Sequence, residues 1–146
     1  MTGATIAWDL GYTGEGMVVG VIDTGIKQTH EAFSVAPEGA KIDQAYLDNV
    51  FAQYGNLMHC KNDEGAYYSA KMPYNWDYFD HDSTPNHTAN NHGSHVAGIV
   101  AGNNGDDFKG IAPDAQIISL QVFTNTGGAY ITDLLSAMED CVYLGV

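Results

Sequence analysis

Two continuous apolar runs predict buried strands of a parallel sheet. The first, GMVVGVIDTGI, covers residues 16–26, and the second, AQIISLQVF, covers residues 115–123 and follows the breaker APD. Short apolar runs bounded by turn residues are typical of strands that are covered on both faces. We therefore expect Asp23 to lie just past the carboxyl end of the first strand.

Three further segments carry helical patterns. HGSHVAGIVAGN, residues 92–103, has the length of a helix with a small-residue face that ends at Gly102 and Asn103. Residues 42–54 show apolar side chains at helical spacing, namely Ile42, Tyr46, Val50 and Tyr54. Residues 132–146 predict an amphipathic helix with Thr132 as N-cap and one apolar stripe, which consists of Leu134, Leu135, Met138, Cys141 and Val142.

The order strand, helix, strand defines the expected fold class. It predicts an α/β protein with a doubly wound parallel sheet and helices on both faces. Residues 59–91 are polar and aromatic and are expected to form one long loop. A chain of 146 residues suits one ordinary domain.

The net charge of the chain argues against some classes of function. There are 18 Asp and Glu residues against 5 Lys and Arg, giving a net charge of −13. Such a surface repels phosphate backbones, so nucleic-acid binding is not expected. The acidity favours either basic substrates or simple solubility.

No signal peptide, membrane span or disulfide framework is visible, and Cys60 and Cys141 have no metal or redox spacing.

The candidate chemistry rests on an Asp after a strand and a His at a helix start. Catalytic sites in open α/β sheets lie at the carboxyl ends of the strands. Asp23 can accept a hydrogen bond from an imidazole Nδ1–H of His92, which leaves Nε2 free to take a proton. Gly93 allows another backbone or a substrate to approach closely. The alternatives are a turn-capping role for Asp23 and a structural role for His92.

Three blocks in the same order resemble the subtilisin-like serine proteases, or subtilases. They are VVGVIDTGI, HGSHVAGIVAGN and GIAPDAQIISLQVF, and YYSAKMPYNWDYFDHD is similar to the lactocepin and C5a-peptidase branch. The likeness covers nearly the whole chain and is weakest over 34–66. It implies acyl transfer on protein or peptide substrates, with Asp23 as the catalytic aspartate and His92 as the general base. His95, one helical turn on, is expected to be packed or to support the site without taking part in the reaction. The likeness also implies secretion or cell-wall attachment.

The chain departs from the family pattern in lacking the nucleophilic serine block. Asp23 and His92 are about twice as far apart as the roughly 30 residues found in subtilisin, so we expect an insertion around 34–80. Ser94, Ser119 and Ser136 do not suit the nucleophile. We expect 1–146 to be the N-terminal part of a catalytic domain, inactive as given. We also expect it to self-associate, because a truncated sheet exposes a strand edge.

The resemblance also implies residues that contact the substrate, but it does not support a metal site. Gly127, Gly128 and Tyr130 fall where the family binds substrate backbone, although a glycine-rich turn before a helix explains them nearly as well. The family's calcium site is not expected, since Ala32 stands at the position of its acid. Asp106 and Asp107 suit a solvated turn better than a weak cation site. No cofactor is expected.

Two functions outside the protease class remain as alternatives. The first is a zinc module built from a cluster of imidazoles and one thiol, which comprises His59, Cys60, His81, His87, His92 and His95. Their spacing matches no closed zinc pattern, and HGSH is not the HExxH helix of metalloproteases. The second is a non-catalytic binding domain that uses an aromatic cluster, which comprises Tyr67, Tyr68, Tyr74, Trp76, Tyr78 and Phe79.

Overall fold

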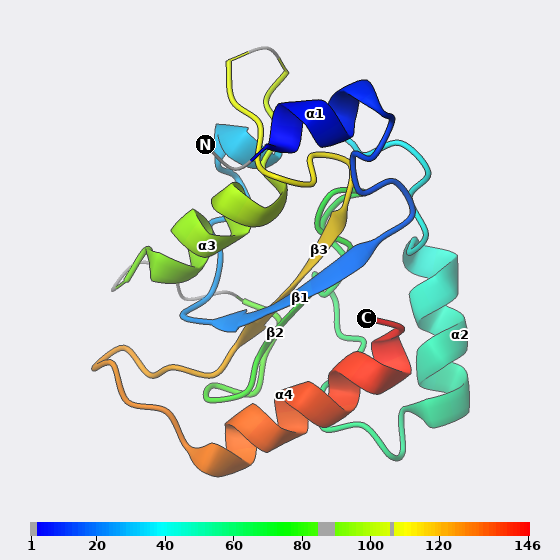
Figure 1. Ribbon diagram of the computed structural model, residues 1–146. Coiled ribbons are helices and arrows are strands. Elements are labelled where there is room, and N and C mark those ends of the chain that lie inside the picture. Colours follow the sequence, from blue (N-terminus) through cyan, green and yellow to red (C-terminus); the bar gives the residue numbers. More distant parts are fainter. Residues whose placement is uncertain (1–2, 85–89, 106) are drawn as a thin grey trace.

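The computed structural model describes residues 3–84, 90–105 and 107–146. Three strands form one parallel sheet in the order β1-β3-β2, with helices on both faces (Figure 1). In chain order the elements are α1 (Ala4–Asp9), β1 (Val18–Asp23), the 3-10 helix η1 (Glu31–Phe33), α2 (Gln44–Tyr54), β2 (Tyr74–Asp77), α3 (His92–Ala101), β3 (Gln116–Gln121) and α4 (Ile131–Leu144). The predicted fold class is confirmed.

The register brings the ends of all three strands to one edge of the sheet. Gln121 at the end of the central strand β3 pairs with Asp23 of β1 on one side and with Asp77 of β2 on the other. Because the three strands are parallel, whatever follows each of them lies at this edge. This carboxyl edge therefore gathers segments that are far apart in the sequence.

Side chains of β3 alternate between two apolar clusters. Ile118 and Leu120 belong to the cluster that α2 and α4 cover, whereas Ile117 belongs to the cluster that α3 covers. Every residue of β3 is buried. Strands covered on both faces are usually rich in apolar residues, which is why the Ile- and Val-rich segment at 115–123 predicted this strand correctly even though Gln116, Ser119 and Gln121 are polar.

Helix α3 lies close to the sheet because its inner face is made of small residues. Gly93, Ala97, Gly98 and Ala101 are its buried positions. The predicted small-residue face is thus confirmed. The helix ends at Ala101, and Gly102 is its C-cap.

The prediction of one long loop over 59–91 was wrong at β2. Tyr74, Trp76 and Tyr78 alternate with Asn75 and Asp77, and all of them are buried. The aromatic members pack in the α2 and α4 cluster. A strand with two buried faces normally reads as an apolar run, and the two polar residues masked this one.

Two details of α4 were also predicted wrongly. The helix begins at Ile131, so its N-cap is Tyr130 rather than Thr132. Of the predicted stripe, Leu134 and Cys141 are half-buried and the others are exposed, namely Leu135, Met138 and Val142. The buried positions are Ala137, Asp140 and Leu144. Asp140 occupies the inner face of α4. The helix therefore does not bury the apolar stripe that hydrophobicity alone would favour.

Helix α2 matches the prediction for 42–54 except at its start. Asp43 is the N-cap, and its side chain accepts a hydrogen bond from the Tyr46 N–H. Ile42 precedes the helix and is buried. None of the helices described is long and apolar enough to cross a membrane.

Candidate active site

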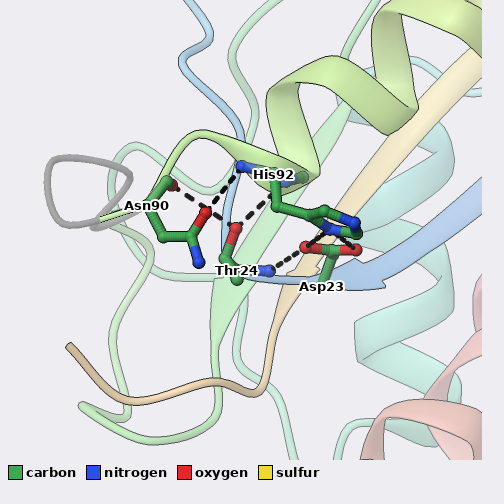
Figure 2. Close-up of polar contacts among 5 residues, drawn as sticks. Asp23, Thr24, Asn90 and His92 are labelled. Atoms are coloured by element: carbon green, nitrogen blue, oxygen red, sulfur yellow. Dashed lines mark hydrogen bonds and ion pairs between the residues drawn. The ribbon is translucent and has the colours of Figure 1, made fainter. Parts of the chain in front are cut away.

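A carboxylate and an imidazole meet at the carboxyl edge of the sheet. Asp23 is the last residue of β1 and His92 is the first residue of α3. Nδ1 of His92 lies 2.9 Å from both carboxylate oxygens of Asp23, as Figure 2 shows. With Nδ1 protonated, this contact fixes the tautomer in which Nε2 carries a lone pair.

Thr24 and Asn90 tie the start of α3 to the end of β1. The Thr24 hydroxyl accepts a hydrogen bond from the Gly93 N–H at 3.0 Å and donates to the Asn90 carbonyl at 3.4 Å (Figure 2). The Asn90 side chain accepts the His92 N–H at 2.9 Å. These bonds satisfy N–H groups that the first helical turn leaves without partners. They also set the position of the imidazole relative to the carboxylate.

Gly93 is required by the close approach of α3 to the chain after β1. A Cβ atom at this position would lie 2.5 Å from the Gly25 carbonyl oxygen and 3.2 Å from Oδ1 of Asp23. Contacts this short mean that any side chain here would force the neighbouring backbone to move. The predicted reason for Gly93, close approach of another backbone, is therefore confirmed.

The carboxylate is sheltered and the imidazole is open to solvent. The Asp23 side chain is 13% exposed, and the His92 side chain is 65% exposed. Asp23 Oδ1 also accepts the Thr24 N–H at 2.7 Å. The pair is thus held from the protein side, while the free imidazole nitrogen faces outward. Such an arrangement suits proton exchange with a group that arrives from outside the described residues.

None of the serines named in the sequence analysis is bonded to this imidazole in the part of the chain described. The Ser94 hydroxyl accepts the Lys27 N–H at 2.9 Å. Ser119 is buried within β3, and Ser136 lies on α4.

Gly127, Gly128 and Tyr130 lie in the segment that joins β3 to α4. A tight turn closes there, with the Thr124 N–H donating to the Gly128 carbonyl at 2.7 Å and the Gly127 N–H donating to the Thr124 carbonyl at 2.9 Å. Gly127 has φ 90°, which a glycine adopts without strain. Tyr130 is exposed. The structure thus brings this segment to the same edge as Asp23, since it follows β3 directly.

The expectation that His95 is packed was wrong. His95 is exposed on α3 and lines a cavity of about 670 Å³ together with Lys27, His30, Ile99 and Phe108. Its position three residues after His92 carries it around the helix, away from the inner face that Ala97 and Gly98 occupy. It does not contact Asp23.

The histidines and the thiol of the zinc alternative are dispersed. His59 contacts Glu139 at 3.0 Å, Cys60 is buried, and His92 contacts Asp23. His87 lies outside the described residues. Among those that are described, no three His, Cys, Asp or Glu side chains are grouped to hold a metal ion.

The two positions that the sequence offered as possible cation ligands are Ala32 and the pair Asp106 and Asp107. Ala32 lies in η1 and offers no ligand. Asp107 is exposed, and Asp106 lies outside the described residues.

Sequence reasoning missed a buried carboxylate in the layer of α2 and α4, away from the histidine pair. Asp140 of α4 is fully buried and accepts hydrogen bonds from the backbone N–H groups of His59 and Cys60 and from the Tyr78 hydroxyl. Burial is the main cause that raises the pKa values of the Cys60 thiol and the Tyr78 hydroxyl above their usual ranges. The sequence signal that could have found Asp140 was its position on the apolar face of the predicted helix.

The fold and the site define an α/β protein with a histidine–carboxylate pair at the carboxyl edge of a parallel sheet. The model of the subtilase family matches residues 14–144, so the chain belongs to this family. This confirms the resemblance drawn from the three sequence blocks.

Several proteases are identical to the chain at about a third of the aligned positions. The PII-type proteinase of Lacticaseibacillus paracasei is 35% identical over 92% of the chain, and the minor extracellular protease Vpr of Bacillus subtilis is 34% identical over 98%. The C5a peptidase of Streptococcus pyogenes is 32% identical over 90%. The chain spans only 7%, 14% and 11% of the lengths of these three relatives.

Proposed function

We propose that the chain supplies the aspartate and histidine of a serine endopeptidase. His92 is the general base, and Asp23 orients its imidazole and stabilises the imidazolium that forms. The contact between Nδ1 of His92 and both oxygens of Asp23 carries the proposal, because it is the geometry that the base of a catalytic triad requires. The serine comes from beyond residue 146.

The mechanism follows from the two ends of the imidazole. Nε2 takes the proton of the serine hydroxyl as the oxygen attacks the peptide carbonyl carbon. The same nitrogen then gives the proton to the leaving amine, and a water repeats the cycle to release the acyl group. Asp23 stays ionised throughout and keeps Nδ1 protonated.

Covalent labelling by a serine-directed fluorophosphonate, read by intact mass, tests this proposal. The proteins compared are the 146-residue chain, a longer form that runs through the family's serine block, and the longer form with His92→Ala. His95→Ala in the longer form is the matched control, since this histidine lies on the same helix without contacting Asp23. We expect only the longer wild type and His95→Ala to take up label.

The expected loss for His92→Ala is large. In subtilisin, another member of the family, removing the corresponding base lowers turnover by about 10⁶, and we expect labelling here to fall to background. Labelling of the short chain would contradict its proposed inactivity. A longer form that folds but never labels would refute the protease assignment and favour the binding-domain alternative.

We also propose where the substrate binds and where the protein acts. Gly127, Gly128 and Tyr130 form part of the cleft for a protein or peptide substrate, supported by their position after β3 at the edge that holds Asp23. The parent protein acts outside the cell or on the cell wall. The relatives named minor extracellular protease Vpr and extracellular basic protease support this location. Detection of the protein in medium or wall fractions tests it.

We further propose that the isolated chain self-associates through the edge at β1. Among the described strands, β1 pairs only with β3, so its other side presents free backbone groups. Helix α4 packs on the same strand, where a Cβ at Gly20 would lie 3.0 Å from the Cys141 sulfur, and it exposes an apolar stripe to solvent. The stripe consists of Ile131, Leu135, Met138 and Val142. Unpaired edges and apolar faces favour association. Light scattering at tens of micromolar should show oligomers, and a monomer there would refute the proposal.

A further inference from the structure

A cavity of about 670 Å³ lies along the exposed side of α3. Its lining comes from three segments, namely the chain after β1, helix α3 and the loop that follows α3. Small-molecule sites in proteins have volumes of about 300–1,000 Å³, so the cavity is large enough for such a ligand. Neither Asp23 nor His92 lines it. The cavity is therefore separate from the histidine–carboxylate pair.

Hydrogen bonds hold the walls of this cavity together. The Lys27 N–H donates to the Ser94 hydroxyl at 2.9 Å, which joins the chain after β1 to α3. The Asn103 N–H donates to the Ala32 carbonyl at 2.6 Å, which joins the same segment to the chain just after α3. Walls that are bonded to one another lose little conformational freedom when a ligand enters, which lowers the entropic cost of binding.

Ile99 and Phe108 form the apolar part of the lining. Ile99 is 64% exposed and Phe108 is 41% exposed, so both side chains have surface free for a ligand. A Cβ added to Gly102 would lie 2.5 Å from the Phe108 ring, and one added to Gly98 would lie 3.9 Å from it. The two glycines thus let the ring come close to α3 and form a wall of the cavity.

Basic side chains outnumber acids in the lining, although acids dominate the chain. Lys27, His30 and His95 line the cavity with a single acid, Glu31. The whole chain has 18 Asp and Glu residues against 5 Lys and Arg. At physiological ionic strength, exposed charges more than about 8 Å apart are largely screened from one another. The local basic groups therefore decide which charge the cavity attracts.

These basic groups have N–H donors available for a ligand. Among the described residues, no carboxylate lies within ion-pair distance of Lys27, His30 or His95. Nδ1 of His30 accepts the Ala32 N–H at 3.1 Å, so the neutral ring carries its proton on Nε2. An ammonium and an imidazole N–H are good donors to a carboxylate, and the ammonium adds charge to the hydrogen bond.

We propose that this cavity binds a carboxylate that carries a large apolar group. Lys27 and the imidazole N–H groups hold the carboxylate, and Ile99 and Phe108 contact the apolar group. A ligand with only one of these two features would use only half of the lining. The proposal does not depend on the protease function, since it uses neither Asp23 nor His92.

Isothermal titration calorimetry with phenylbutyrate tests the site in the 146-residue chain and in the longer, serine-containing form. Phenylbutanamide keeps the shape without the charge, phenylbutylamine reverses the charge, and butyrate lacks the ring. We expect phenylbutyrate to bind at least about tenfold more tightly than each of these three, because a hydrogen bond to a charged group and a buried ring each contribute about a factor of ten or more.

Variants locate the ligand. Lys27→Met removes the charge and keeps the length of the side chain, and it should weaken phenylbutyrate binding about tenfold. Phe108→Ala should weaken it by a similar factor through the apolar group. Lys61→Met is the matched control, since this exposed lysine does not line the cavity. If Phe108→Ala fails to fold, Ile99→Ala gives the same readout.

A peptide carboxylate distinguishes the two sources of such a ligand. N-acetyl-glycyl-phenylalanine ends in a carboxylate beside an aromatic ring, as phenylbutyrate does. Tighter binding of this peptide supports the site with the end of a peptide chain as its ligand. Weaker binding of the peptide, with phenylbutyrate still bound, supports the site with a free organic acid.

Several results would overturn the proposal. They are the absence of binding, an amide or amine that binds as tightly as the acid, and binding that Lys27→Met and Phe108→Ala both leave unchanged. Binding that disappears in the longer form would show that the chain beyond residue 146 packs into the cavity, which also overturns it. Fluorophosphonate labelling of the longer form is a separate readout, so failure of the protease function leaves the cavity site standing and the reverse also holds.

Discussion

Replacing Gly93 by alanine tests the contact that sets His92 against Asp23. The new Cβ would lie 2.5 Å from the Gly25 carbonyl oxygen, whereas carbon–oxygen contacts in proteins are about 3.3 Å or longer. The chain must therefore move by about 0.8 Å. The obstacle is backbone at the end of β1, which cannot rotate away as a side chain would.

The expected cost follows from two opposing terms. Overpacking of this kind costs about 1–3 kcal/mol, and alanine in a helix regains up to about 1 kcal/mol relative to glycine. We expect a net loss of about 1–2 kcal/mol in the free energy of unfolding, or a Tm lower by about 2–8 °C for a chain of this size. In the longer form, the displaced imidazole should also slow fluorophosphonate labelling.

Gly98→Ala is the matched control on the same helix. Its Cβ would meet nothing closer than Phe108 at 3.9 Å, so it should be neutral or stabilise by up to about 1 kcal/mol. Thermal unfolding followed by circular dichroism compares the two variants. The reasoning is refuted if Gly93→Ala melts at or above the temperature of Gly98→Ala, or if it labels at the wild-type rate.

Two further predictions concern buried charged groups away from the histidine pair. Asp140→Ala should lower the free energy of unfolding by about 3 kcal/mol or more, because it removes the acceptor of the buried Cys60 N–H and Tyr78 hydroxyl and of the part-buried His59 N–H. Urea unfolding measures this loss, and the exposed Glu139→Gln should cost less than about 1 kcal/mol. Burial lowers the pKa of Lys71 to about 8 from its ordinary 10.5, so the unfolded chain holds this proton longer and the contribution of Lys71 to stability should rise between pH 8 and pH 10.5. Stability curves of wild type and Lys71→Met should diverge in that direction over this range, and parallel curves would show that the amine titrates normally.

The histidine pair was predictable because its signals are local. An apolar run ending in Asp and a small-residue helix beginning at His each follow from a few neighbouring residues. Parallel topology alone then places strand ends and helix starts at one edge. The 2.9 Å contact between Asp23 and His92 agrees with that expectation.

The sequence by itself determined the two apolar strands, the small-residue face of α3 and the family. Only the tertiary structure showed that Tyr74–Asp77 is a strand, because its aromatic and polar residues are buried on opposite faces that no local pattern reveals. It likewise decided the orientation of α4, since Asp140 is buried to bind distant N–H groups. Long-range hydrogen bonds and packing override local hydrophobicity where a buried polar group finds its partners elsewhere in the chain.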